Sequence, residues 1–159
     1  MTFTTRVARA RARMEELGVD VLLLSVGPDL PYLTGYEAMP LERLTMLVLP
    51  RAGDARLVVP RLEAPRVEPQ PDVFEIVAWD ETDDPVELVA RLAGPVVRAA
   101  IGDHTWARFV LDLQRALPGT AFVRASTVLS PLRMVKDPAE IEALRRAGAA
   151  VDAIAVEMR

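Results

Sequence analysis

The sequence predicts one α/β domain, in which a mixed five- to six-stranded sheet is flanked by helices. Short apolar runs alternate with amphipathic segments of helical period, which is typical of this class. Two of the runs are joined by so short a link that they must form an antiparallel hairpin. The 159 residues, 51% hydrophobic and 26% charged, match the size and composition of a single folded domain.

The chain is expected to open with a helix from about residue 5 to residue 17, because apolar side chains recur there at spacings of three and four. They are Val7, Ala10, Met14 and Leu17. Gly18 can supply the left-handed residue that ends many helices. Arg6, Arg9 and Arg13 share one face of this helix, and we expect that face to be solvated.

The expected strands are short and apolar, as strands covered on both faces are. They span residues 19–25, 44–49, 55–59, 73–79, 96–101 and 121–124. A turn at residues 51–54 joins the second and third strands into the hairpin. The stretch from Leu30 to Tyr36 is a poor strand because Pro31 removes a donor, and Gly35 indicates a turn. The proline-rich segment 60–72 leaves room only for a short helical turn near residues 62–67.

Three more helices are expected. Asp84-Pro85-Val86-Glu87 combines a capping aspartate, a proline in the first turn and a glutamate that reaches back, so a helix should run from there to about Ala93. Another should span residues 105–117, with Trp106 among its inner, core residues, and Trp79 should be buried on the strand at residues 73–79. Asp137-Pro138-Ala139-Glu140 repeats the capping pattern and opens a helix to about residue 158. Its apolar stripe has nothing in the domain to cover it; the stripe comprises Ile141, Leu144, Val151, Ile154 and Met158.

The composition excludes several kinds of chemistry. The chain has no cysteine and one histidine, so thiolate chemistry is excluded and a metal site has too few soft ligands; no metal-binding or catalytic residue is assigned. His104 is expected to help cap the helix that follows it. The acidic cluster at residues 80–87 lacks the spacing of a calcium loop and is expected to be solvated. No phosphate-binding glycine motif or nucleophile elbow occurs.

Charge and hydropathy also limit the partners. A net charge of −4 gives no electrostatic support for binding nucleic acid. The apolar runs are shorter than the roughly 20 residues that a bilayer requires, so no membrane partner is expected. No leader segment is recognisable, and a cytoplasmic location is expected.

Tyr32 and Tyr36 are the candidate substrate-binding residues. They flank a turn at the end of a strand region, where α/β folds often contact ligands. The alternative is that both rings are half-buried packing residues.

Two motifs carry a resemblance to a known family. The segment Pro28-Asp29-Leu30-Pro31-Tyr32-Leu33-Thr34-Gly35-Tyr36 resembles the N-x-x-Y-L-T-G-[FY] motif in the N-terminal domains of creatinase, prolidase and aminopeptidase P. The segment Leu132-Arg133-Met134-Val135-Lys136-Asp137-Pro138-Ala139-Glu140-Ile141 resembles the R-x-[IV]-K-[ST]-x-x-E-[IL] motif that joins that domain to the catalytic one. The matches depart at Asp29, where the family often has asparagine, and at Asp137, where it often has serine or threonine.

The resemblance implies a ribonuclease H-like creatinase N-terminal domain over residues 1–130, and over residues 131–159 a linker and the first helix of a C-terminal catalytic domain that is missing here. It implies a parent Xaa-Pro dipeptidase or aminopeptidase, with two divalent metal ions (Mn, Co or Zn) in the missing domain. This chain alone is expected to be inactive. Its implied roles are dimerisation and control of active-site access. The implied partners are its own C-terminal domain, a second copy in a homodimer, and short proline-containing peptides, which Tyr32 and Tyr36 would approach.

Two other functions stay open at this point. The chain can be a free-standing oligomerisation or peptide-binding module, in which case the coding sequence stops after residue 159. It can also be a fragment of a creatinase-like amidinohydrolase, because that family shares the same domain.

Overall fold

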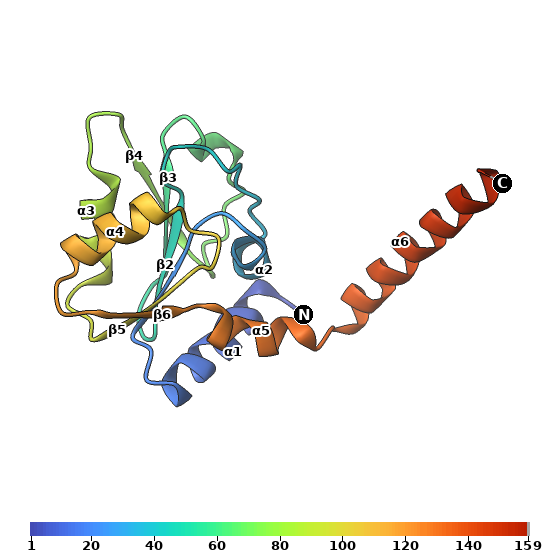
Figure 1. Cartoon of the computed structure of the whole chain (residues 1–159), viewed down its shortest axis with the longest axis horizontal. Helices are drawn as coiled ribbons and strands as arrows, with labels where there is room; N and C mark the ends of the chain where they lie inside the picture. Colours follow the sequence, from blue (N-terminus) through green and yellow to red (C-terminus); the bar gives the residue numbers. More distant parts are fainter. Residues whose placement is uncertain (159) are drawn as a thin grey trace.

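A computed structural model describes residues 1–158 and contains a six-stranded sheet with helices on both faces (Figure 1). The strand order across the sheet is β4-β3-β2-β1-β5-β6. The strands are β1 (Val21–Leu24), β2 (Met46–Pro50), β3 (Arg56–Pro60), β4 (Glu75–Trp79), β5 (Arg98–Ile101) and β6 (Ala121–Arg124). Each lies within, or within one residue of, the run that predicted it.

The sheet is mixed, as predicted. β2 pairs antiparallel with both β1 and β3, and Met46 lies opposite Val58 in the predicted hairpin. The other neighbours, β1 with β5, β3 with β4 and β5 with β6, are parallel. Parallel strands need a long crossover connection, which is usually helical, and such connections place helices on the faces of the sheet.

One face of the sheet is covered by α1 (Phe3–Glu16), α2 (Asp29–Thr34) and α5 (Ser126–Met134). The opposite face is covered by α3 (Pro85–Ala93) and α4 (Ala107–Ala116). The predicted stripe of α1 buries Val7, Ala10 and Met14 against the first face. A short 3₁₀ turn, η1 (Ala64–Arg66), lies inside the segment where a helical turn was expected.

The last helix, α6 (Pro138–Glu157), projects away from the sheet (Figure 1). Its predicted apolar stripe is exposed, with Leu144 59%, Val151 65% and Ile154 56% accessible. The predicted capping pattern is present at its start, because Asp137 and Glu140 each accept a hydrogen bond from the other's backbone amide. The predicted division of the chain at residue 130 stays a prediction, and α5 runs across it.

Two helices were not predicted. The segment expected to be irregular before Gly35 forms α2, and Gly35 ends it with φ of 74°. Pro31 is tolerated because it lies in the first turn, where backbone amides have no intrahelical acceptor. No element was expected after β6, where α5 buries Val128 and Leu129 despite Pro131 inside it.

The core position of Trp106 was predicted wrongly. Trp106 is the residue before α4, with extended backbone angles, and its side chain is 39% accessible. Because it lies outside the helix, the helical period does not apply to it; its ring stacks on Phe109 with centroids 6.3 Å apart. Trp79 is buried as predicted, and its indole donates a 2.9 Å hydrogen bond to the carbonyl of Leu44.

Candidate functional site at the junction with the last helix

Tyr32 and Tyr36, the predicted substrate-binding residues, lie at α2 and directly after it. Each is only 9% accessible and belongs to the core cluster under α1. The amide of Tyr36 donates to the hydroxyl of Thr34, which in turn donates to the carbonyl of Leu30, so the turn after α2 is held by side-chain bonds. The two rings lie in different surroundings: Tyr32 faces a charged junction and Tyr36 lines a cavity.

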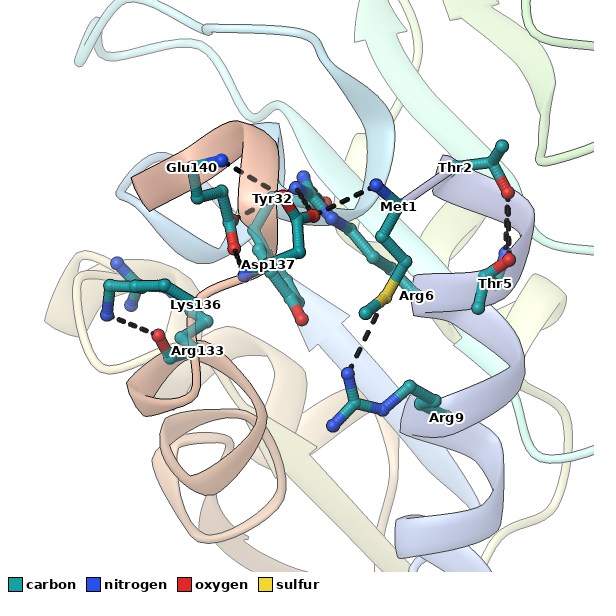
Figure 2. Close-up of polar contacts among 10 residues, drawn as sticks. All are labelled: Met1, Thr2, Thr5, Arg6, Arg9, Tyr32, Arg133, Lys136, Asp137 and Glu140. Atoms are coloured by element: carbon teal, nitrogen blue, oxygen red, sulfur yellow. Dashed lines mark hydrogen bonds and ion pairs between the residues drawn. The ribbon is translucent and has the colours of Figure 1, made fainter. Parts of the chain in front are cut away.

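The charged junction brings α1, α2 and α6 together around Arg6 (Figure 2). The guanidinium of Arg6 lies over the ring of Tyr32, 4.6 Å from its centroid, and donates 3.1 Å to the carbonyl of the same residue. Its second nitrogen donates 3.0 Å to Glu140 and lies 3.5 Å from Asp137. Only 13% of the Arg6 side chain is accessible, so the prediction of a solvated arginine face is wrong for this residue.

Asp137 is held at the junction by two hydrogen bonds. It accepts bonds from the amide of Glu140 and from the α-amino group of Met1, both at 2.9 Å (Figure 2). These donors favour the ionised form, and they lower the pKa of Asp137 to about 2, the amide of Glu140 having the largest effect.

A second ion pair holds the other side of the linker. Arg133, at the end of α5, donates 2.7 Å to Asp29 at the start of α2. Between this pair and Asp137 the linker itself is exposed, with Met134 76% and Val135 67% accessible. The two motifs singled out in the sequence are therefore in direct contact.

The cavity beside Tyr36 has a volume of about 310 Å³ and is lined by Phe3, Thr34, Gly35, Arg66 and Gln70, among others. Within the described residues the Tyr36 hydroxyl has no hydrogen-bond partner. Burial, and then the charge of Glu63, raise the pKa of Tyr36, against the opposing effect of Arg66. Tyr36 is therefore neutral at physiological pH and can donate a hydrogen bond.

The other candidates do not form a site. Across residues 1–158, no three His, Cys, Asp or Glu side chains are grouped to hold a metal ion. His104 is exposed and does not cap α4, whose preceding residue makes no side-chain cap bond. In the acidic cluster, Asp80 forms an exposed ion pair with Arg61.

None of the helices in the described residues is long and apolar enough to cross a membrane.

Arg6 is the functional candidate that sequence reasoning missed. It directly precedes Val7 of the apolar stripe, and that position at the edge of a buried face is the signal that separates it from a solvated arginine. Its acidic partners lie more than 130 residues away, so no local charge pattern reveals them.

Residues 6–135 match the family described as the creatinase/prolidase N-terminal domain. The chain belongs to this family. The predicted resemblance is therefore confirmed over most of the sequence, including the whole first motif and residues 132–135 of the second.

Relatives of this creatinase/prolidase N-terminal domain are similar over nearly its whole length. A probable dipeptidase PepE of Mycobacterium tuberculosis is 42% identical over 156 residues, covering 96% of this chain and 41% of the relative. The crystal structure of dipeptidase PepE from Mycobacterium ulcerans superposes with a TM-score of 0.84 at 39% identity, covering 98% of this chain and 43% of that one. A recombinant prolidase from Thermococcus sibiricus gives a TM-score of 0.87 at 26% identity, covering 99% and 44%. The chain thus spans about two-fifths of the length of these relatives.

Proposed function

We propose that this chain is the non-catalytic N-terminal domain of a Xaa-Pro dipeptidase or aminopeptidase. The observation that carries the proposal is its coverage of relatives: it matches 41% of a probable dipeptidase, over a region in which residues 1–158 group no metal ligands. The catalytic residues of the parent protein would then lie in the part that follows α6.

Two divalent metal ions, Mn, Co or Zn, would be held in that C-terminal part. They would supply a water activated for attack on the peptide bond before proline. The described residues would contribute no ligand. Their part in the chemistry would be to shape the approach to the site and to position the helix that leads into it.

The exposed stripe of α6 supports contact with the protein's own C-terminal domain. Large apolar residues such as Leu144 and Ile154 are rarely left exposed in a row on one helix face unless a partner covers them. The assembly of two parent chains into a homodimer, with this domain limiting access to the active site, rests on the resemblance and is part of the same proposal. So is a cytoplasmic location.

Tyr36 is proposed to contact short proline-containing peptides. The support for Tyr36 is its place in the wall of a cavity, where a neutral hydroxyl can donate a hydrogen bond to a bound peptide. Tyr32 is proposed in a supporting role, because Arg6 already covers its ring.

The test begins with the coding sequence after residue 159 and the activity of its complete product. The proposal predicts a reading frame that continues, and a product that cleaves Xaa-Pro dipeptides in the presence of Mn²⁺. Tyr36→Phe in that product should raise KM more than it lowers kcat, with Phe122→Tyr, in an edge strand, as the control. A stop codon after residue 159 would favour a free-standing module instead. A product that hydrolyses creatine rather than peptides would favour an amidinohydrolase.

A further inference from the structure

The direction in which α6 leaves the sheet domain is set at its first turn. From residue 141 to residue 156 every residue of the helix is exposed, so the helix body does not rest on the domain. The linker before it is exposed as well, and Val135 has extended backbone angles. Any contact that fixes the direction of α6 must therefore act on residues 137–140.

Arg6 is the side chain that reaches both charged residues of that turn. One guanidinium nitrogen donates a 3.0 Å hydrogen bond to Glu140 and lies 3.5 Å from the carboxylate of Asp137. The other donates to the carbonyl of Tyr32. The group is stacked on Tyr32 and lies 5.7 Å from the centroid of Phe3. Arg6 thus connects two elements of the sheet domain with the start of α6, as the dashed contacts in Figure 2 show.

We propose that Arg6 is a positioning residue: it latches the first turn of α6 and thereby sets the direction of the chain that follows. Removing it should let α6 pivot at residues 135–137 without unfolding the domain. The significance of that direction for a catalytic domain rests on the proposed function, whereas the latch itself does not.

The contacts indicate a role in orientation rather than in stability. A buried ion pair often adds little net stability, because desolvation offsets the attraction, and its best-attested use is to specify one geometry. The Nε atom of Arg6 is buried without a partner in the described residues, which further reduces any net gain. If Arg6 is replaced by methionine, Asp137 keeps the amide of Glu140 and the α-amino group of Met1, and Glu140 keeps the amide of Asp137, so neither carboxylate loses all its donors.

The test is a distance measurement between two spin labels. Because the chain has no cysteine, Ala107→Cys in α4 and Ala153→Cys in α6, both exposed, give unique labelling sites. The labelled chain is diluted with unlabelled chain, so that only distances within one molecule are read. With Arg6 present, one narrow distance distribution is expected. Arg6→Met should broaden it by about twofold or more, because a helix freed at a short linker turns about a few backbone dihedrals.

Arg9→Met is the matched control. Arg9 lies on the same helix and carries the same charge, but its guanidinium donates to the sulfur of Met1 and not to Asp137 or Glu140, so the distribution should stay narrow. Glu140→Gln keeps an oxygen for the cap but removes the charge that Arg6 binds, and it should broaden the distribution without touching the sheet domain. A folded Arg6→Met chain with the original width, a narrow Glu140→Gln distribution, or equal broadening by Arg9→Met would each overturn the latch. Peptide hydrolysis is not read in this experiment, so a failure of the proposed function would leave its result intact.

Discussion

Arg6 in α1 donates a 3.0 Å hydrogen bond to Glu140 in α6, across 134 residues of sequence. The same glutamate caps the helix by accepting from the amide of Asp137. Glu140, the acidic residue of the linker motif, therefore performs two tasks in this chain: it starts α6 and it ties that start to the first helix. The geometry of the linker motif therefore depends on contacts between residues from both ends of the sequence.

The start of α6 should lose stability only in strong acid, where Asp137 becomes protonated. Its pKa of about 2 lies below the ordinary aspartate value of about 3.9. Since the folded pKa is the lower one, the stabilisation of the α6 start is complete above about pH 4 and is lost as the pH falls toward 2. We expect a carboxyl-carbon NMR titration of Asp137 to give a midpoint near 2, and Asp137→Asn to remove this part of the acid dependence. A midpoint near 4 would contradict the hydrogen bonding described for this residue.

The helix α5 should be a full part of the core. Leu129 is completely buried under the sheet, so Leu129→Ala should lower the free energy of unfolding by about 2–5 kcal/mol through lost contacts and the cavity left behind. Leu111→Ala removes the same atoms from a side chain that is 55% accessible and should change stability by less than about 0.5 kcal/mol. Urea unfolding of both variants measures the difference. Equal effects would mean that α5 does not pack as described.

Gly35 should tolerate alanine less well than Gly53, although both glycines have a positive φ. At φ of 74°, a Cβ on residue 35 would lie 2.8 Å from Cζ of Phe3, whereas a Cβ on Gly53, at φ of 94°, meets nothing within 4 Å. Both alanine variants carry backbone strain of about 1–2 kcal/mol. Gly35→Ala should lose more stability than Gly53→Ala, because Phe3 must also move. Thermal unfolding compares them, and a smaller loss for Gly35→Ala would refute the close approach.

The chain by itself should associate through α6. Its exposed stripe contains Val151 and Ile154, and two such helices can cover each other. Sedimentation velocity should show a species larger than the monomer that grows with concentration. Val151→Asp combined with Ile154→Asp should return the chain to a monomer while α6 stays helical by circular dichroism. A strictly monomeric unmodified chain with an ordered α6 would contradict this expectation.

Most of the sheet could be predicted from the sequence because its strands are nearly pure apolar runs separated by turn residues. The capping patterns at Asp84 and Asp137 likewise predicted helix starts that the structure confirms, since both are local hydrogen-bond arrangements. The two missed helices each contain a proline. Pro31 is harmless in a first turn, and Pro131 is held in a helix by packing that no local pattern reveals.

The candidate site was only partly predictable. Tyr32 and Tyr36 are candidates because they flank a turn at the end of a strand region, and their contact with peptides stays a prediction. The local pattern predicts a solvated charge at Arg6, because its partners come from the other end of the chain and such long-range ion pairs leave no periodic signal in sequence. Trp106 was assigned to the core because the helical stripe was extended one position beyond the true start of α4.

The central claim is that the chemistry of the parent protein lies outside this chain. The most direct measurement is hydrolysis of a Xaa-Pro dipeptide by the purified chain with Mn²⁺ or Co²⁺ added, followed by detection of free proline. We expect no turnover above the metal-only control, because no group of metal ligands exists within residues 1–158. Reproducible turnover that follows the chain through purification would contradict it.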